Sequence, residues 1–444
     1  MFTRLILILA TTALLAGCGG SGSSSAPDPA QEAAKTWVRG FMDDTYLWYN
    51  EIVDVPPANY ATAPDYFKAL LVKSRDRFSF SMPLDQAVNQ LLEGLETGYG
   101  VKLGMTAAGR LFALYVDPNS PAAASLIRGA EITAVNGQPL ANLTSTDLSS
   151  ALSPGQPGAT VNLTFRRPGT ATFQTTSLVS ATFSTTTVGQ PSIISLAGGG
   201  KAGYLLFNQH LRTSEQGLIN AMTYFKQQGI SELVLDMRYN TGGALSIAQE
   251  VASMIGGTAV QGKTFEKLLF NTKHPEMTND PQNTYRFSAL DSTGAQLPLL
   301  GLRRVFVLTG PNTCSASESV INGLLPHIPV IRIGWTTCGK PYGFFPTTYG
   351  QQTYFAIQVE GVNANGTDDF KSGFAPTCQA YDDLNYPLGN TNEASLNAAV
   401  SYMGTNACPP MRTVTLPKTT LSGAIPGIGD IQLIGQLPGL KLLK

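Results

Sequence analysis

The chain has 444 residues, with 29 Lys or Arg and 30 Asp or Glu, so its formal net charge is −1. A chain of this length is long enough for two or three domains. The nearly balanced charge provides no basic patch, which argues against nucleic acid as a partner. Charged residues make up only 13% of the chain, against about 25% in an average domain, and this low share fits an exported protein.

The N-terminus has the pattern of an export signal. Arg4 precedes an apolar run from Leu5 to Leu15, which is too short to span a membrane comfortably but has the length of a signal peptide. The letters L-A-G-C, which end at Cys18, resemble a bacterial lipobox, in which cleavage precedes the Cys and its sulfur is acylated. An ordinary signal peptide with a chance Cys is the simpler alternative.

The residues after Cys18 favour the lipoprotein interpretation. G-G-S-G-S-S-S is a flexible polar stretch that suits a tether behind a lipid anchor. We therefore expect a signal peptide over 1–17 and a tether over 18–30. Because Gly19 and not Asp follows the Cys, nothing indicates retention in the inner membrane. We expect a lipid-anchored protein of a bacterial cell envelope, at the outer membrane, facing the periplasm or the surface.

Residues 31–96 have helical patterns and are expected to form an N-terminal helical domain. The aromatic-rich segment W-V-R-G-F-M-D-D-T-Y-L-W-Y begins at Trp37, and apolar-periodic stretches follow at Tyr66 to Leu71 and Leu84 to Leu95. We expect most of these aromatic side chains to lie in a core.

A module of short alternating strands is expected over 97–182. It opens with G-Y-G-V and continues with S-P-A before a short helix. A-E-I and a V-N-G turn follow, and then a helix at 145–152 and a strand at 160–166. This order resembles a PDZ domain, although the usual Gly-Asp before the isoleucine is Ala-Glu here. Such a domain adds a peptide as an extra strand and holds its terminal carboxylate on backbone N–H groups. The resemblance assigns that role to Tyr99, Gly100 and Val101.

An α/β core is expected over 183–410. A strand at 201–208, a helix at 214–228 and a buried strand at 233–235 lead to the turn D-M-R-Y-N-T-G-G, which ends at Gly243. Acyl transfer forms a negatively charged oxygen, the oxyanion, which backbone N–H groups can stabilise. Glycines at the N-terminus of a helix allow these N–H groups to approach the oxyanion closely because they have no side chain. The simpler interpretation is a plain strand-to-helix turn. Residues 262–300 are polar and irregular, and we expect surface loops there.

Ser315 stands at the start of a predicted helix within a strand–helix–strand unit. The strands are Val305 to Thr309 and Val330 to Ile333. Lys340 follows the second strand. Because parallel strands end at the same edge of a sheet, Lys340 can lie beside Ser315. A Ser in this place is most often only a helix cap, so its position alone is weak evidence for catalysis.

The two segments together are more specific. T-C-S-A-S-E, followed 25 residues later by C-G-K, resembles the serine–lysine site of the carboxyl-terminal processing (tail-specific) proteases. The resemblance implies that Ser315 is the nucleophile and Lys340 its general base. It also implies that Gly242 or Gly243, together with Ala316, holds the oxyanion.

The resemblance extends to neighbouring positions. Ser317 becomes a structural hydroxyl in the first helical turn. Many members of the family have a Gln four residues after the Lys, whereas this chain has Phe344, which leaves open what orients the Lys. D-R-F-S at 76–79 resembles the N-terminal region of lipoprotein members of the family.

The expected chemistry requires a neutral lysine. A free lysine has a pKa of about 10.4 and is a poor base at neutral pH, but burial disfavours the ammonium form. Neutral Lys340 then takes the proton of Ser315, which attacks a peptide carbonyl, and the lysine later protonates the leaving amine. The expected substrates are proteins or peptides with free C-termini, cleaved near those ends.

Four cysteines remain if Cys18 is acylated, which suggests disulfides in an oxidising compartment. Cys378 with Cys408 is the preferred pair, and Cys314 with Cys338 is a second candidate. The cysteines have no C-x-x-C spacing and the three His are scattered, so we expect no zinc site. No cofactor is expected. The tail, 411–444, has no clear periodicity and is expected to be poorly ordered.

The fold class expected is therefore multidomain α/β: a helical N-terminal region, a PDZ-like β domain and a protease core resembling the ClpP and crotonase folds. The expected function is a serine-type endopeptidase with a Ser/Lys dyad. Three alternatives remain: a hydrolase that uses His210 as its base, a non-catalytic PDZ-type peptide-binding lipoprotein, and a crotonase-like acyl-transfer enzyme. The last has no coenzyme A motif to support it.

Overall fold

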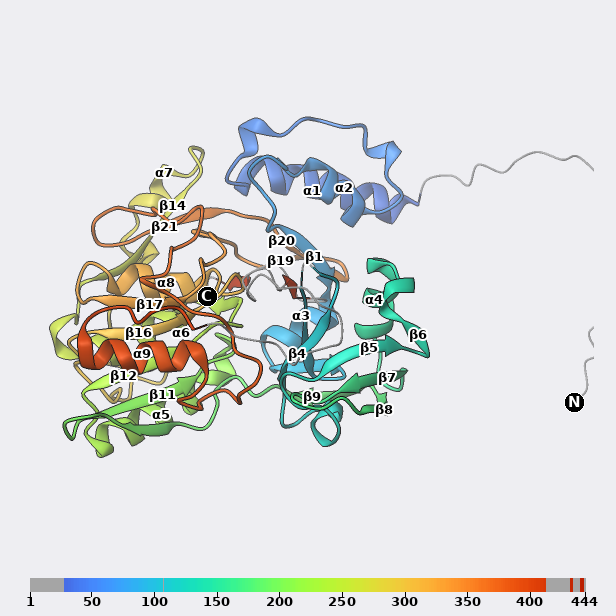
Figure 1. The fold of residues 1–444 in the computed structure, drawn as a ribbon. Helices are drawn as coiled ribbons and strands as arrows, with labels where there is room; N and C mark the ends of the chain where they lie inside the picture. Colours follow the sequence, from blue (N-terminus) through green and yellow to red (C-terminus); the bar gives the residue numbers. More distant parts are fainter. Residues whose placement is uncertain (1–27, 107, 413–431, 434–439, 443–444) are drawn as a thin grey trace, which may run out of the picture.

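The computed structural model describes residues 28–106, 108–412, 432–433 and 440–442 (Figure 1). The predicted signal peptide and the expected lipidation site, Cys18, lie outside the described residues. Among the residues described, no helix is both long enough and apolar enough to cross a membrane.

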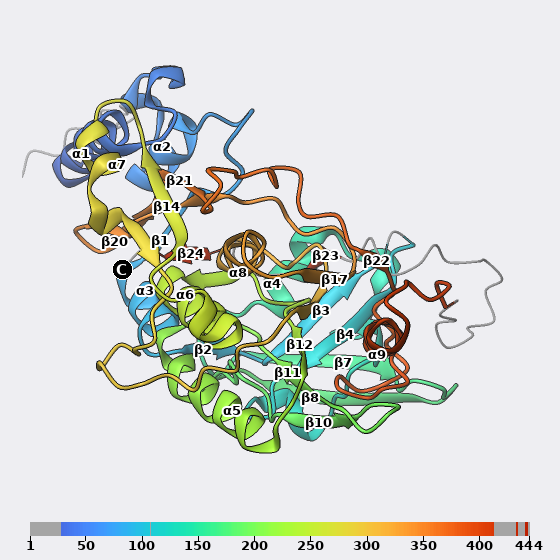
Figure 2. The same ribbon diagram turned by 90° about the vertical axis from the view of Figure 1, so that its left-hand side faces the viewer.

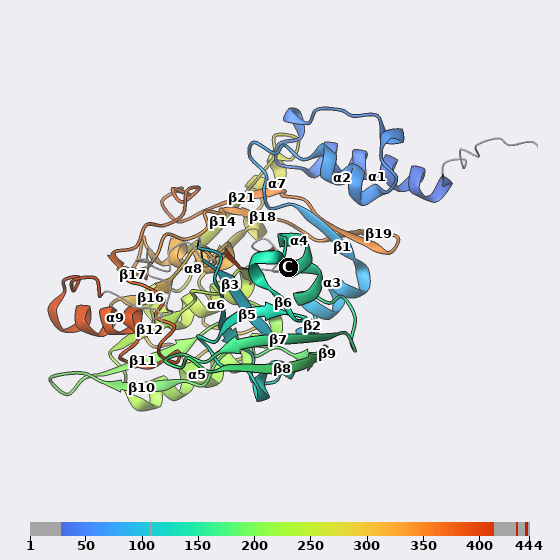
Figure 3. The same ribbon diagram turned by 45° about the vertical axis from the view of Figure 1, so that its right-hand side comes forward.

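Most aromatic side chains of the N-terminal domain lie in a hydrophobic core, as expected, and this core also includes Phe344, Tyr354 and Phe355. Asp28 caps the first helix and Pro29 occupies its first position, where a missing N–H has no cost. The helices are α1 (Pro29–Thr45), α2 (Ala63–Leu70) and α3 (Leu84–Leu91). The strands that tie this domain to the core are β1 (Phe80–Pro83), β20 (Gln352–Phe355) and β19 (Thr347–Tyr349), in the order β1-β20-β19. Figure 3 shows α1 and α2 beyond this sheet, away from the main body.

The second domain is an antiparallel sheet covered by one helix. Its own strands run in the order β3-β4-β5-β7-β8, and β6 pairs with β5. The helix begins with a capping box between Thr144 and Asp147. The elements are β3 (Val101–Met105), β4 (Leu111–Val116), β5 (Glu131–Val135), β6 (Gln138–Pro139), α4 (Ser145–Leu152), β7 (Thr160–Arg166) and β8 (Phe173–Val179), flanked by the pair β2 (Leu95–Gly98) and β9 (Ala181–Ser184).

The core is a six-stranded sheet between two layers of helices. The order is β10-β11-β12-β16-β17-β22, and all neighbours are parallel except β10 and β11. The strands are β10 (Ser192–Ser195), β11 (Lys201–Leu206), β12 (Glu232–Asp236), β16 (Val305–Thr309), β17 (Val330–Gly334) and β22 (Cys378–Gln379). The helices are α5 (Glu215–Gln228), α6 (Leu245–Gly256), α8 (Ala316–Leu324) and α9 (Ala394–Thr405).

Side chains that alternate along these strands contribute to two hydrophobic cores, one on each face of the sheet. Leu233, Leu235 and Val307 pack with α5, α6 and α8, whereas Val234 and Phe306 pack with α9. This alternation follows from the two-residue period of a strand, and Figure 2 shows α9 on the opposite side of the sheet from α5 and α6. The central stretches of β12 (233–235) and β16 (305–308) are apolar because both faces of the sheet are covered.

The segment 262–300 contains more regular structure than the sequence predicted. It holds β14 (Thr264–Phe270), α7 (Pro275–Asn279) and β15 (Thr284–Arg286). β14 forms a sheet in the order β15-β14-β21-β18, with β21 (Val359–Val362) and β18 (Tyr342–Gly343). Phe265 and Leu268 are buried in the main core. Pairing with β21, almost 100 residues later in the chain, thus overrides the weak local pattern.

Two described pieces of the tail are strands. β23 (Gln432–Leu433) pairs with β3, and β24 (Leu440–Leu442) pairs with β13 (Gly242–Ala244). The sequence predicted a poorly ordered tail because no local pattern marks these residues. Their strand conformation comes from pairing with the edges of two other domains.

Candidate active site

Ser315 lies between the end of β16 and the start of α8, as predicted. Its backbone has φ 60° and ψ −117°, a conformation that costs a residue with a side chain about 1–3 kcal/mol. Its Oγ is buried and has no hydrogen-bond partner in the described part of the chain. A buried hydroxyl that caps no helix amide is available for chemistry, so the geometry favours a nucleophile over an N-cap.

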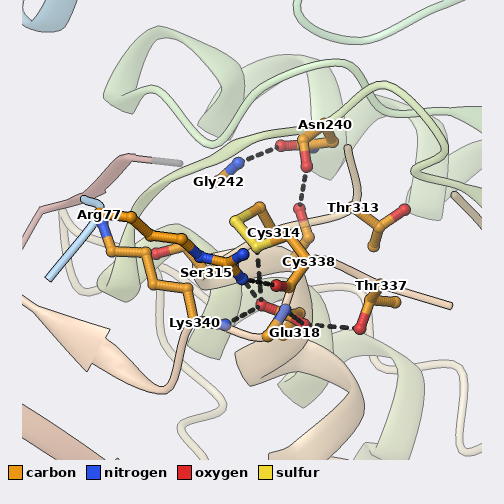
Figure 4. The surroundings of a disulfide bond; sticks show 12 residues. Arg77, Asn240, Gly242, Thr313, Cys314, Ser315, Glu318, Thr337, Cys338 and Lys340 are labelled. Atoms are coloured by element: carbon orange, nitrogen blue, oxygen red, sulfur yellow. Dashed lines mark hydrogen bonds between the residues drawn. A yellow bond between two sulfur atoms is a disulfide. The ribbon is translucent and has the colours of Figure 1, made fainter. Parts of the chain in front are cut away.

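A single buried carboxylate joins the Ser315 turn to the Lys340 turn. The backbone amides of Ser315 and Lys340 both donate to Oε2 of Glu318, each at 2.9 Å (Figure 4). Its Oε1 accepts from Thr337 Oγ1 at 2.6 Å and from Gly339 N at 2.8 Å. Burial raises the pKa of Glu318, and these four donors oppose the rise because they stabilise the ionised form. The structure thus brings the two predicted residues together.

The side chain of Lys340 is buried against aromatic rings. Its Nζ lies 4.3 Å from the ring centre of Phe344 and 5.2 Å from that of Phe78. Phe344 occupies the position where a Gln was expected from the family pattern, so a ring face replaces an amide there. Phe78 comes from the N-terminal domain, and its neighbour Arg77 donates to the carbonyl of Cys338 at 2.6 Å. The N-terminal domain therefore forms one wall of the lysine site.

The glycine turn lies beside the Ser315 turn. The amide of Gly242 donates to Asn240 Oδ1 at 3.0 Å, so of the two predicted glycines Gly243 has the amide suited to an oxyanion. Gly243 has φ 142°, and a Cβ there would lie 2.1 Å from the carbonyl oxygen of His210. Ala316 is the first residue of α8, and its N–H belongs to the first helical turn, which lacks intrahelical acceptors.

Hydrogen bonds hold these two turns against each other. The carbonyl of Asn240 accepts from Ser317 Oγ at 3.0 Å and from the amide of Cys314 at 3.1 Å. Ser317 therefore has the structural role predicted for it. Thr313 Oγ1 donates to the carbonyl of Met237 at 2.9 Å and adds a further link.

Both candidate cysteine pairs form disulfides. Cys314 with Cys338 joins the serine turn to the lysine turn, and Cys378 with Cys408 joins β22 to the segment after α9. Among the described residues, Cys314, Cys338 and Glu318 form the one cluster with metal-ligand spacing. Its two sulfurs are bonded to each other, so they are not available as thiolate ligands.

His210 lies next to the glycine turn rather than at an open sheet edge. Its amide donates to the carbonyl of Gly242 at 3.0 Å, and its Nδ1 lies 3.1 Å from Asn240 Oδ1. Burial lowers the pKa of His210 to about 3. The ring is thus neutral at pH 7 but is a weak proton acceptor, which disfavours the alternative in which it is the base.

The predicted carboxylate loop connects β2 to β3. Tyr99 is buried, and Gly100 has φ 72° with Ser120 packed so closely that a Cβ would clash. The carbonyl of Gly100 accepts from the amide of Asp117 at 2.9 Å, and Val101 begins β3. The loop is thus held at the end of the strand along which a PDZ domain receives peptides.

An ion-pair cluster fixes this domain to the core beside the glycine turn. Arg128 bonds to Asp382 and to the hydroxyl of Tyr239, and Arg238 bonds to Asp382 at 2.7 Å. Arg238 also bonds to Glu393 at 2.9 and 3.0 Å. Arg238 Nε also donates to Asp236 Oδ1 at 2.9 Å, so this side chain braces both its own turn and the domain interface.

Sequence reasoning missed the roles of Glu318 and Phe78. Glu318 is part of the S-A-S-E motif, but its function depends on which backbone amides meet around it. Phe78 is part of D-R-F-S, more than 230 residues from the Ser315 turn. Nothing in the local sequence indicates that this ring lies against Lys340.

Three family models match the chain in the order of its domains. The S41 peptidase N-terminal domain matches residues 33–80, a PDZ domain matches residues 112–167, and peptidase family S41 matches residues 201–380. The last match contains both Ser315 and Lys340. These matches confirm the predicted fold class: a helical N-terminal domain, a PDZ domain and an α/β peptidase core.

Two known proteins are similar over much of the chain. A carboxyl-terminal-processing protease of Picosynechococcus sp. is 27% identical over 225 residues, which are 50% of this chain and 49% of that protein. The chain thus spans about half the length of this relative. A crystal structure assigned to the S41 proteases, from Bacteroides fragilis, has 25% identity and a TM-score of 0.66, and the match covers 87% of this chain and 100% of that one.

Proposed function

We propose that this chain, which belongs to the S41 peptidase family and carries a PDZ domain, is a serine endopeptidase that cleaves proteins near their C-termini. The observation that carries the proposal is the shared Glu318 carboxylate, which holds the amides of Ser315 and Lys340 together. The buried Oγ of Ser315, without a hydrogen-bond partner among the described residues, supports its role as nucleophile.

The reaction follows from the groups around these turns. Neutral Lys340 accepts the proton of Ser315 Oγ while that oxygen attacks the peptide carbonyl. The oxyanion is stabilised by the amides of Gly243 and Ala316. The ammonium of Lys340 then protonates the leaving amine, and a water molecule deprotonated by the same lysine hydrolyses the acyl-enzyme.

Two serines one helical turn apart provide a matched test. Ser315 and Ser319 both have a buried Oγ without a partner in the described residues. Ser315→Ala should retain the fold and lose peptidase activity on a protein substrate such as casein. Ser319→Ala removes an equivalent hydroxyl and should retain activity. Equal activity of the two variants would end the proposal.

The PDZ loop supports the preference for C-termini. Tyr99, Gly100 and Val101 are the proposed receptors for the terminal carboxylate of the substrate. A peptide substrate with a free C-terminus should therefore have a lower KM than the same peptide with an amidated C-terminus. Equal KM values would restrict the proposal to a general endopeptidase.

The proposed location is the cell envelope, through a lipid anchor on Cys18. The support is the sequence pattern alone: the apolar run, L-A-G-C and the polar tether. Metabolic labelling with a radioactive fatty acid should mark the wild-type chain and not Cys18→Ser. Label in both forms, or in neither, would contradict the anchor without affecting the proposed chemistry.

The second candidate is a non-catalytic lipoprotein that binds peptides through its PDZ domain. The PDZ match favours it as much as it favours a protease. It predicts that Ser315→Ala and the wild type bind peptides equally and that neither cleaves them, so the serine comparison above distinguishes the two functions.

A further inference from the structure

Residues 440–442 form the strand β24 at the candidate active site. β24 pairs in parallel with β13, so that Leu440 faces Gly242, Lys441 faces Gly243 and Leu442 faces Ala244. β24 also contacts β18, which begins two residues after Lys340. The backbone of 440–442 therefore lies between the strand that carries the proposed oxyanion amide and the strand that follows the proposed base.

An earlier part of the tail pairs with the PDZ domain. β23 runs antiparallel to β3, with Gln432 opposite Met105 and Leu433 opposite Gly104. β3 begins at Val101, the last residue of the loop 99–101, and its edge is where a PDZ domain adds a peptide strand. Figure 1 draws both tail strands between the core and the PDZ domain.

One polypeptide segment thus pairs with two strand edges, first with β3 of the PDZ domain and then with β13 at the candidate active site. Only six residues separate Leu433 from Leu440. Both pairings use backbone hydrogen bonds, which depend little on side chains, so other segments can replace the tail. The tail residues at β13 belong to the sequence L-K-L-L-K, which is apolar with interspersed lysines.

We propose that the edge of β13 is a binding site for extended C-terminal peptide segments, and that residues 440–442 of this chain occupy it as an intramolecular competitor. The binding site deepens the proposed function, because it names how a substrate would lie at the Ser315 turn. The competition itself requires no catalysis.

The strength of competition follows from tethering. A segment that is covalently joined to its own binding site has an effective concentration of the order of 1 mM. For a free peptide that binds with a Kd of about 0.1 mM, this concentration weakens the apparent affinity about tenfold. A variant whose tail cannot pair should therefore bind the free peptide about tenfold more tightly than a chain with the natural tail.

The test uses the full chain with Ser315→Ala, so that no cleavage interferes. A fluorescent peptide of residues 436–444 is titrated into this chain and into the same chain with Lys441→Pro, which removes the backbone N–H at the centre of β24. Leu421→Pro, upstream of both tail strands, is the control. The same peptide with Pro in place of Lys441 tests whether binding requires a strand.

We expect about tenfold tighter binding with Lys441→Pro, no change with Leu421→Pro and weak binding of the Pro-containing peptide. Bound peptide should also slow hydrogen exchange at the Gly243 amide. Equal affinity with and without Lys441→Pro, or no binding to either chain, would overturn the proposal. If the tail competes in this way but the chain with Ser315 intact cleaves no substrate, the proposed peptidase function is refuted and the proposed binding site stands.

Discussion

The backbone amides of Ser315 and Lys340 donate to the same oxygen of one buried carboxylate, each at 2.9 Å. This shared acceptor, on Glu318, makes the position of the serine turn depend on that of the lysine turn. The disulfide between Cys314 and Cys338 links the same two turns one residue before Ser315 and two before Lys340. Two different kinds of bond thus hold the proposed nucleophile and base together.

Glu318→Gln should impair catalysis more than substrate binding. A Gln offers one acceptor oxygen and an NH₂ group, so two of the four donors lose their partner, at about 1–3 kcal/mol each. Small displacements of reacting groups can lower the rate about 100-fold. We expect kcat to fall about that far with a smaller change in KM. Thr337→Ser, which keeps a hydroxyl donor to Glu318, should behave almost as wild type, and a rise in KM alone would contradict the positioning role.

Phe344→Leu should lower activity because the ring that packs against the amine and holds Lys340 in place is lost. The ring of Phe344 lies 4.3 Å from the lysine Nζ, and Leu keeps apolar volume but removes the ring face. Phe355→Leu is the control, because Phe355 is equally buried and stacks on Phe80 in the same cluster.

Both of these Phe→Leu changes should cost about 1–1.5 kcal/mol of stability, but only Phe344→Leu should lower kcat severalfold. The measurements are kcat for peptide hydrolysis and thermal unfolding of each variant. Equal kcat values in the two variants would show that the ring at 344 has no special effect on the lysine.

The two disulfides should differ in their effect on activity. Their cysteines are 24 and 30 residues apart, so removal of either should cost a similar stability, about 3–4 kcal/mol by loop entropy. Of these two disulfides, only Cys314–Cys338 joins the Ser315 turn to the Lys340 turn. Cys314→Ser with Cys338→Ser should therefore lower kcat at a temperature where the chain stays folded, whereas Cys378→Ser with Cys408→Ser should lower only the Tm. The opposite pattern would contradict the account.

Docking of the PDZ domain should weaken in acid. Burial raises the pKa of Asp382, but Arg128 and Arg238 outweigh it and lower that pKa to about 2. Because the folded pKa is below the unfolded value of about 3.9, the stabilisation is present above pH 4 and is lost as the pH falls towards 2. Asp382→Asn should remove this pH dependence and, because the buried Arg128 then loses its carboxylate partner, cost about 3–5 kcal/mol.

Amide hydrogen exchange along Leu111–Val116 and at Tyr239 measures this docking. Arg166→Gln is the control, because its partner Glu131 lies within the PDZ domain. Faster exchange at Tyr239 in Asp382→Asn but not in Arg166→Gln is expected. Unchanged exchange in both would show that the ion pairs do not hold the interface.

The sequence predicted the pair Ser315 and Lys340 because parallel strands end at one edge of a sheet. It did not predict Glu318 as their common acceptor, because that role requires three turn amides and one hydroxyl to meet at a single side chain. It also did not predict β14 or β24. Each of these strands is formed by pairing with a distant segment, and such pairing leaves little local pattern.

The most direct test of the serine–lysine pair is covalent labelling of the folded chain. A fluorophosphonate probe should react with Ser315, and peptide mapping by mass spectrometry should locate the adduct there, even if the reaction takes hours. Lys340→Met should retain the fold and lose the label, because no base remains to accept the serine proton. Label at Ser315 of equal extent in Lys340→Met, or a folded wild type labelled only at another residue, would contradict the account.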